Sequence, residues 1–164
     1  MIFDTYDSLL GEMRLCCDGT YLTAVTFAGQ KYEKLHIPED AVLGHHPVLE
    51  QTKIWLSQYF SGSVPDFLPP MDLKGSEFQK RVWTLLLEIP YGKTVTYGEL
   101  AKKLGCRSAQ AIGGAVGRNP ISILIPCHRV VGADGSLTGY AGGVEKKEFL
   151  HNLEAKICKK DHLG

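Results

Sequence analysis

The sequence predicts an α+β fold in two domains: a small N-terminal antiparallel sheet with a helix, then a helical C-terminal domain. Three observations lead to this prediction. The first thirty residues contain short runs of β-branched and aromatic residues, later residues show successive capped helical patterns, and three prolines lie between residues 63 and 73. We therefore expect domains at residues 1–73 and 74–164, in a chain long enough to bury a core.

The N-terminal domain is predicted to begin with hairpins. Its strand-like runs are broken at Gly11 and at Asp18-Gly19, and an Asp-Gly pair favours a tight hairpin turn. From Pro47 to Phe60 the apolar residues recur at helical spacing, and proline suits the first turn of a helix. A helix is therefore expected to follow the sheet.

The C-terminal domain is predicted to open with two capped helices. Ser76 and Gln79 fit a capping box. The apolar stripe that follows it should face the core and consists of Phe78, Val82, Leu85, Leu86 and Ile89. Thr96 and Glu99 fit a second capping box, which opens a short helix through Leu104.

A third helix is predicted over AQAIGGAVGR, where Ser108 can act as the N-cap and Asn119-Pro120 ends the pattern. Two short helices joined by a turn of about four residues are typical of a helix-turn-helix unit. This helix consists mostly of glycine and alanine, so few of its side chains extend beyond Cβ. Each glycine in it lowers helix stability by about 1 kcal/mol relative to alanine. Tight packing against a neighbouring helix and entry into a narrow DNA groove are both compatible with such a helix.

The remaining chain is predicted to hold a short strand, a loop and a final helix. ISIL (residues 121–124) has the composition of a strand, and GADGSLTG (residues 132–139) is rich in turn residues. Residues 145–156 show helical periodicity. The apolar residues expected on the inward face of that helix are Phe149, Leu150, Leu153 and Ile157.

Charge is distributed unevenly along a chain whose formal net charge is zero. Residues 1–73 hold 4 basic and 10 acidic side chains, whereas residues 74–164 hold 14 basic and 8 acidic ones. The basic excess predicts that the C-terminal domain meets a polyanion such as nucleic acid, although a merely solvated basic face has the same composition.

The composition also indicates the cellular compartment in which the protein is expected. Five cysteines without regular spacing argue against a disulfide framework and for a reducing environment. No apolar run is long enough to cross a membrane, and the N-terminus lacks the features of a signal peptide. We expect a cytoplasmic protein without membrane association.

Cys127 and His128 are neighbours in the apolar stretch ILIPCHRVV, residues 123–131. Only a thiolate is a good nucleophile, and apolar surroundings raise the pKa of a thiol. The imidazole can take the thiol proton, and we expect a bridging water because adjacent residues of an extended chain point to opposite sides. Glu154 is the candidate carboxylate that would orient the imidazole. A small core cysteine beside a structural histidine would give the same pair.

Three motifs around this pair resemble those of O6-alkylguanine-DNA alkyltransferases, also called methylated-DNA–protein-cysteine methyltransferases. NPISILIPCHRVVGADGSLTGYAGG (residues 119–143), with its PCHRV core, resembles the active-site segment of the family. YGKTVTYGELA upstream and GGVEKKEFL downstream occur in the order of the family. The resemblance is strong over residues 74–157 and general over residues 1–73. It implies that the C-terminal domain carries a helix-turn-helix and an active-site cysteine turn.

The resemblance implies direct-reversal DNA repair. An alkyl group would pass to the cysteine from O6 of guanine in double-stranded DNA, with O4 of thymine as a second candidate position that loses the group. The nucleotide would first be flipped out through minor-groove binding. The thioether product has no good leaving group, so each molecule would react once. We expect no metal, flavin or S-adenosylmethionine, no obligate protein partner, and a monomer.

The resemblance also assigns roles around the reacting atoms. Cys127 would accept the alkyl group, and His128 would act through a water with Glu154 behind it. Tyr97 would donate a hydrogen bond to the N3 side of guanine. Asn119 would tie backbone groups of the cysteine loop together.

Further residues are implied in binding guanine and DNA. Gln110 stands where many family members carry an intercalating arginine; glutamine can fill the gap left by a flipped base but brings no charge. The guanine pocket would be lined by Val130, Tyr140, Ala141 and Gly142. The other DNA contacts would come from phosphate-binding side chains and the thin helix, at Arg107, Arg118, Ala109 and Gly113.

Two other functions are compatible with parts of the pattern. A DNA-binding module would recognise alkylated guanine without removing the group, and Cys127 argues against it. A Cys-His hydrolase would need an oxyanion hole and would turn over repeatedly. A zinc site made from Cys16-Cys17 and His45-His46 is disfavoured, because adjacent pairs lack the usual ligand spacing.

Overall fold

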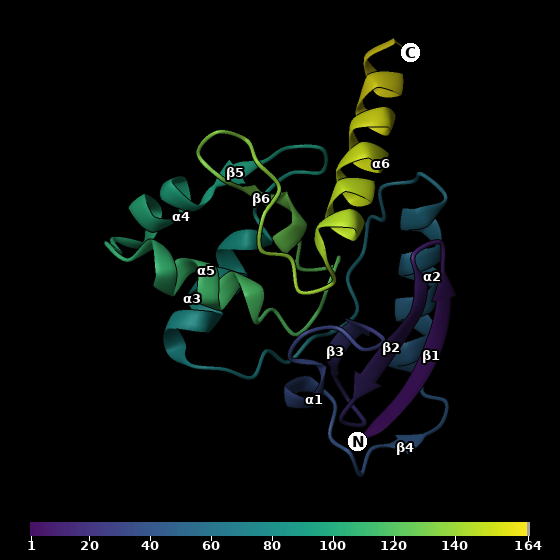
Figure 1. The fold of residues 1–164 in the computed structure, drawn as a ribbon. Helices are drawn as coiled ribbons and strands as arrows, with labels where there is room; N and C mark the ends of the chain where they lie inside the picture. The colour runs from purple at the N-terminus through teal and green to yellow at the C-terminus, as the bar shows by residue number, and fades with distance from the viewer. Residues whose placement is uncertain (164) are drawn as a thin grey trace. The chain divides into compact units, whose positions relative to one another are not determined.

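The computed structural model describes the backbone of residues 1–163 and the side chains of residues 1–157, arranged in two units (Figure 1). The first unit consists of residues 1–74 together with residues 120–122, and the second holds the rest of the chain. Strands dominate the first unit and helices the second, so the predicted α+β class is confirmed.

A four-stranded sheet in the order β3-β2-β1-β4 forms the centre of the first unit. Its strands are β1 (Ile2–Ser8), β2 (Gly11–Cys17), β3 (Leu22–Phe27) and β4 (Val42–Leu43). The first three are antiparallel, whereas the short β4 runs parallel to β1. The predicted turn is present: Asp18 Oδ1 accepts hydrogen bonds from two following N–H groups, and Gly19 has φ 97°.

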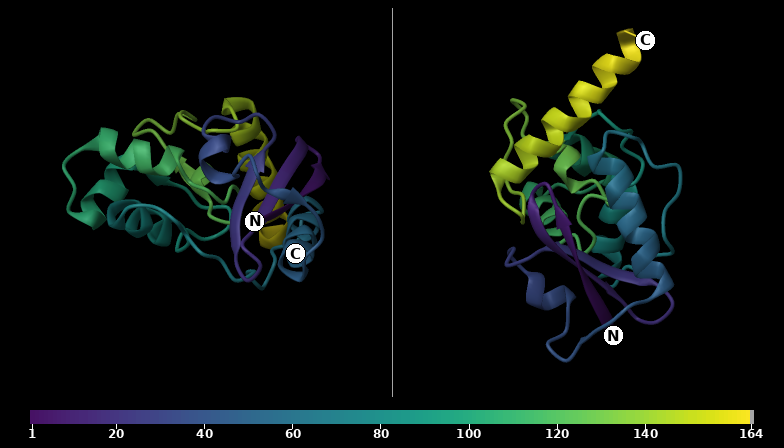
Figure 2. Two further views of the ribbon diagram at one scale, coloured as in Figure 1. Left: turned by 90° about the horizontal axis from the view of Figure 1, so that it is seen from below. Right: turned by 90° about the vertical axis from the view of Figure 1, so that its right-hand side faces the viewer.

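Two helices complete the first unit, α1 (Glu33–His36) and α2 (Pro47–Phe60). α2 lies along β1 and β2 (Figures 1 and 2). It begins at Pro47 as predicted, but its N-cap is His46, whose Nδ1 accepts from the Val48 N–H. That cap was not predicted because Ser, Thr, Asp and Asn dominate this position. α1 is held to the sheet by Glu33, which accepts from Thr26 Oγ1 at 2.7 Å.

The second unit contains four helices and a two-stranded parallel sheet within the described residues. The elements are α3 (Glu77–Leu86), β5 (Val95–Thr96), α4 (Tyr97–Leu104), α5 (Ala109–Gly117), the 3-10 turn η1 (Cys127–Arg129), β6 (Val130–Val131) and α6 (Val144–Leu163). α3, α4 and α5 contact one another, and α4 with α5 forms the predicted helix-turn-helix. Among the described helices, none has both the length and the apolar character that crossing a bilayer requires.

Three helices of the second unit begin at the predicted caps, although the capping box predicted at Thr96 and Glu99 has only one of its two hydrogen bonds. Ser76 and Gln79 form a complete capping box at α3, with hydrogen bonds in both directions. Thr96 and Ser108 accept from the backbone N–H of the third residue of α4 and α5. These local contacts fix where each helix starts and therefore where its exposed and buried faces lie.

One side of α5 packs closely against α3. Trp83, which is 1% exposed, donates from Nε1 to the carbonyl oxygen of Ala115 at 2.8 Å. Gly75 lies against the same indole, where a Cβ would approach the ring to 2.6 Å. Gly113 and Gly117 have open space at the Cβ position instead. Small residues thus allow close packing on one side of α5 and leave another side bare.

The prediction of a strand over residues 121–124 was wrong. Ile121 makes only an isolated bridge to Val25 of β3, where the Val25 N–H bonds to Pro120 O and the Ser122 N–H bonds to Val25 O. Ile123 then has φ 72° in a turn. The apolar composition reflects burial of an irregular segment, because β-branched residues fill cores without extended pairing as well.

α6 begins at Val144 and is longer than predicted, and its buried face is different. Leu150 is fully buried, whereas the other apolar residues assigned inward are only partly buried: Phe149, Leu153 and Ile157. The remaining buried side chains are charged, namely Lys147 and Glu154. Positions 147, 150 and 154 share one helix face, so two ionisable groups enter the interior where only apolar residues and Glu154 were considered.

Candidate active site

Cys127 lies in a tight turn that Pro126 sets up. Pro126 has φ −81° and ψ 64°, the geometry of an inverse γ-turn, and the Cys127 N–H donates to Ile125 O at 2.8 Å. The Arg129 N–H then donates to Pro126 O at 3.0 Å and closes η1. The cysteine is therefore presented from a turn rather than from an extended strand.

Asn119 fixes this turn from the second residue after the end of α5. Its Nδ2 donates at 2.7 Å to Ile125 O, the carbonyl that also accepts from the Cys127 N–H. The Asn119 side chain is 2% exposed and also hydrogen-bonds to the Cys127 thiol. Asn119 thus joins the helix-turn-helix to the cysteine turn.

The thiol of Cys127 is buried, at 5% exposure. Burial raises its pKa, and the hydrogen bond with Asn119 and the positive charge of Lys147 partly oppose that rise. A thiol with a raised pKa is protonated at neutral pH, so nucleophilic attack requires a base that removes its proton.

His128 and Glu154 form a contact inside the second unit. His128 Nε2 lies 2.5 Å from Glu154 Oε2, and the two residues are 0% and 2% exposed. Burial lowers the pKa of His128, and the contact with Glu154 opposes this. Burial alone would raise the pKa of Glu154, but its bonds to His128 and Arg129 hold it well below the usual range. The pair is therefore a neutral imidazole and a carboxylate.

Arg129 holds the same carboxylate from another side. Its Nε lies 2.8 Å from Glu154 Oε1 and its Nη2 lies 3.2 Å from Oε2. Nη1 donates to Ile89 O at 2.8 Å, and the guanidinium lies 5.4 Å from the centre of the Tyr91 ring. The Gly92 N–H completes the set by donating to Oε1 at 3.0 Å. The sequence placed Arg129 in the PCHRV motif but gave it no role.

The parallel pair β5–β6 places Tyr97 beside the cysteine turn. Its register pairs Val95 with Val130, the residue directly after η1. The Tyr97 hydroxyl donates to Thr138 O at 3.1 Å. Burial and then the nearby Cys127 raise the pKa of Tyr97, so the phenol keeps its proton at neutral pH.

Lys147 is a site residue that the sequence did not single out. Its side chain is 1% exposed, and Nζ donates at 2.7 Å to Thr138 O, the acceptor that Tyr97 also uses. Nζ lies 5.9 Å from the centre of the Tyr97 ring. Burial lowers the pKa of Lys147, while the nearby Cys127 raises it. Its place on the face of Leu150 was the available signal, but lysines at such positions usually extend to solvent.

The residues predicted to line the guanine pocket lie on either side of the loop between β6 and α6. Val130 is fully buried, and its N–H donates to Cys127 O. Tyr140 is 8% exposed. The residues that follow it, Ala141 and Gly142, are partly buried. The structure therefore brings Val130 to the cysteine turn and places the other three just before α6.

Residues 77–156 match the family model described as 6-O-methylguanine DNA methyltransferase, DNA binding domain. Residues 1–73 match the model of the ribonuclease-like domain of the same methyltransferases. The chain belongs to this family.

Individual relatives agree with the family models. The methylated-DNA–protein-cysteine methyltransferase of Mycobacterium tuberculosis is 43% identical, over 97% of this chain and 95% of its own. The protein of the same name from Methanosarcina acetivorans is 43% identical, over 94% and 98%. The crystal structure of Mycobacterium tuberculosis OGT in complex with DNA superposes with a TM-score of 0.86 and 39% identity, over 96% of this chain and 94% of that chain.

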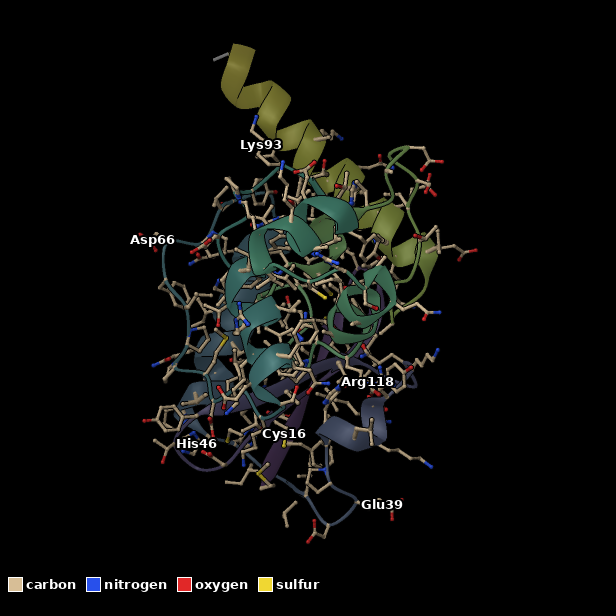
Figure 3. All side chains as sticks on the ribbon, turned by 90° about the vertical axis from the view of Figure 1, so that its left-hand side faces the viewer. Cys16, Glu39, His46, Asp66, Lys93 and Arg118 are labelled. Atoms are coloured by element: carbon tan, nitrogen blue, oxygen red, sulfur yellow. The ribbon has the colours of Figure 1, made fainter. Side chains whose placement is uncertain are left out.

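The residues that a 6-O-methylguanine DNA methyltransferase of this sequence would use on DNA lie on or beside α5. Gln110 is exposed in the first turn, and Gly113 follows on the same face. Arg118 is partly buried at the helix end and donates from Nη1 to Gly114 O at 3.3 Å (Figure 3). The other predicted contacts are exposed, Arg107 and Ala109.

The possible metal ligands that lie together share only His45 with the set considered in the sequence. Among the described residues, Asp4, His45 and Glu50 form a group with suitable atoms. Lys53 already supplies a cation there, with Nζ 2.6 Å from Asp4 and 3.3 Å from Glu50. The earlier candidates are separated in function: the two cysteines are buried thiols in β2, and the second histidine caps α2 (Figure 3).

Proposed function

We propose that this protein repairs alkylated DNA by direct reversal, moving the alkyl group from O6 of guanine to Sγ of Cys127 once per molecule. The observation that carries the proposal is the buried thiol of Cys127, held in a γ-turn next to the contact between His128 and Glu154. The relatives named methylated-DNA–protein-cysteine methyltransferase support the same reaction.

The transfer is a displacement at carbon. The thiol proton passes to neutral His128, through a water, and the thiolate attacks the alkyl carbon in line with the bond to O6. The S–C bond forms as the C–O6 bond breaks, and the electron pair stays on the guanine. A proton then returns to the guanine, so the products are a neutral guanine and a thioether. Nothing removes the alkyl group from sulfur, and the reaction ends after one event.

Tyr97 is proposed as the donor that stabilises the departing guanine. A positioned donor lowers the barrier where negative charge develops, and the raised pKa of this phenol keeps its proton available. In the present structure the hydroxyl bonds to Thr138 O, so guanine would have to replace that carbonyl as the acceptor. The side chain of Tyr140 and the chain at Ala141 and Gly142 would line the pocket.

Double-stranded DNA is the proposed partner, bound by residues 74–164 through the helix-turn-helix. A related OGT has been crystallised in complex with DNA, and the bare, exposed face of α5 suits a close approach to a narrow groove. Gln110 would occupy the gap left by the flipped nucleotide, while Arg107 and Arg118 would contact phosphates. We propose that a monomer is sufficient and that no cofactor takes part.

Mass spectrometry of a single reaction tests the proposal. The protein is incubated with excess duplex containing one O6-methylguanine, digested with trypsin, and the peptide containing Cys127 is weighed. We expect a gain of one methylene on that peptide, and the yield should stop at one equivalent. Cys127→Ala should bind the duplex without repairing it, whereas Cys106→Ala, which changes a free cysteine in another part of the same unit, should react normally.

Two outcomes would contradict the proposal. Tight binding of the lesion with an unmodified Cys127 peptide would indicate a recognition module without transfer. Repeated cleavage of acyl esters by the same cysteine would indicate a hydrolase, because a hydrolase regenerates its thiol.

A further inference from the structure

Glu154 accepts hydrogen bonds from four donors within the described residues. Oε1 accepts from Arg129 Nε and from the Gly92 N–H, and Oε2 accepts from Arg129 Nη2 and faces His128 Nε2. A carboxylate only accepts, so Nε2 must carry a hydrogen, and in the neutral ring Nδ1 is then the acceptor. That tautomer is the form of His128 that can take a proton from a thiol.

The net charge of the buried cluster formed by His128, Glu154 and Arg129 depends on Arg129. A guanidinium stays charged at any working pH, and here it lies against the carboxylate with two hydrogen bonds and 11% side-chain exposure. Arg129 and Glu154 together are neutral. Protonating His128 would therefore add an uncompensated positive charge to a buried site, which is costly.

Without Arg129 the balance would reverse. The negative charge of Glu154 would then face His128 alone at 2.5 Å, and such a charge favours imidazolium. Imidazolium has no acceptor atom and cannot remove a proton from Cys127. The other charged or titratable groups around the pair are His151, whose ring contacts His128 O, and Lys93 and Tyr91 near the guanidinium. The permanent positive charge at the carboxylate is that of Arg129, whose Nε and Nη2 lie 2.8 Å and 3.2 Å from its oxygens.

We propose that Arg129 is a positioning residue that balances the charge of Glu154 and so keeps His128 neutral and able to act as the base. This inference rests on the proposed function, because it assigns the base for the same transfer. It also explains why the arginine directly after the histidine points back into the site rather than to solvent.

The test is the pH profile of single-turnover transfer in three proteins. In the wild type the rate should fall on acidification only below the ordinary imidazole value of 6.5, since burial and Arg129 lower the pKa of His128. In Arg129→Gln the acid midpoint should rise by about one pH unit or more, with roughly tenfold slower transfer near neutrality and recovery at alkaline pH. Arg129→Lys, which restores the charge, should return the midpoint towards the wild-type value.

If the role of Arg129 were purely structural, the transfer rate of Arg129→Gln would be lower than that of the wild type by the same factor at every pH. The acid midpoint would then stay in place, and that result would overturn the inference. Adding Glu154→Gln to Arg129→Gln removes both charges and should bring the midpoint back down. A midpoint that stays high in this double variant would also count against charge balance.

A measurement on the wild type does not depend on any variant folding. Nuclear magnetic resonance of ring-labelled histidine should show His128 neutral at pH 7 with its proton on Nε2. A protonated ring at that pH would overturn the inference. Methylation of Cys127 in the same sample would still support the proposed function, so the failures of the two proposals are distinguishable.

Discussion

At the scale of single residues, Gln110 is the group proposed to fill the gap left by the flipped nucleotide. It is exposed in the first turn of α5 and lies on the face that continues with Gly113. A glutamine can hydrogen-bond the base left without its partner, but it contributes no electrostatic attraction to phosphate. Extrusion of the nucleotide should therefore depend on the shape and amide of this side chain more than on charge.

Replacing Gln110 tests this role. Gln110→Ala should slow transfer from duplex DNA by about tenfold, because the flipped state loses the group that fills its gap and extrusion costs a few kcal/mol. Single-turnover rates on duplex measure the effect. The reaction with O6-methylguanine as a free base needs no extrusion and should be unchanged. Equal losses on both substrates would show that Gln110 supports the pocket and not base flipping.

At the scale of elements, α5 combines a packed side and a bare side. The packed side is fixed by the hydrogen bond from Trp83 to Ala115 O, while Gly113 and Gly117 leave open space. Glycine in a helix interior lowers stability, so the bare side weakens the isolated helix. That cost is consistent with a surface reserved for close approach by DNA.

Substitutions at Gly113 should therefore change stability and binding in opposite directions. Gly113→Ala should raise the free energy of unfolding by about 0.5–1 kcal/mol, because alanine restricts the unfolded chain and its Cβ meets nothing. Gly113→Leu should weaken duplex binding by roughly tenfold, because its side chain would occupy the groove-facing surface. Urea denaturation and fluorescence anisotropy measure the two effects. Thr84→Leu is the matched control because it places a leucine at an exposed position of α3, and this variant should bind duplex normally.

Elements whose signals are local were predictable from the sequence. The Ser76–Gln79 capping box, the Thr96 N-cap, the Asp18-Gly19 turn and the proline start of α2 depend on neighbours within four residues, and all are present; the reciprocal bond predicted from Glu99 is not. The β5–β6 pair was not predictable, because two strands of two residues leave no pattern and their partners lie far apart in the sequence. For the same reason the hydrogen bonds from Arg129 to Glu154 were missed, although Arg129 lay in the PCHRV motif and Glu154 was the candidate carboxylate.

The inward face of α6 shows a different limit of sequence patterns. Periodicity identifies apolar faces, so the charged residues Lys147 and Glu154 were not both expected inside. Both are buried because each has a partner, a backbone carbonyl for the lysine and an arginine and histidine for the glutamate. The ionisable residues of the candidate site therefore lie at positions of α6 where charged side chains interrupt the buried apolar face.

At the scale of the whole molecule, the division of charge follows the division of the fold. The acidic excess lies in residues 1–73, and the basic excess lies in the residues that hold the helix-turn-helix and the cysteine turn. A chain with no net charge can therefore still present one basic unit to a polyanion. The buried ionisable groups, in contrast, link the stability of the fold to pH.

Acid should destabilise the protein in two steps. The folded state lowers the pKa of the buried histidines His36 and His128, so below the ordinary value of 6.5 the unfolded chain binds more protons and stability falls. Glu154 also has a lowered pKa when folded, so its contribution is present above 4.5 and is lost as the pH falls through and below that value. Each extra proton bound by the unfolded chain removes about 1.4 kcal/mol per pH unit.

Urea denaturation between about pH 7.5 and about pH 5 measures the first step, where the histidines account for the loss. His128→Gln should flatten this part of the profile by about the slope of one proton, even if its stability at the upper pH is lower. Cys127→Ala, which leaves His128 and Glu154 in place, should keep the wild-type slope. An unchanged slope in His128→Gln would mean that folding does not lower the pKa of His128, and it would contradict the burial effect that keeps this base neutral.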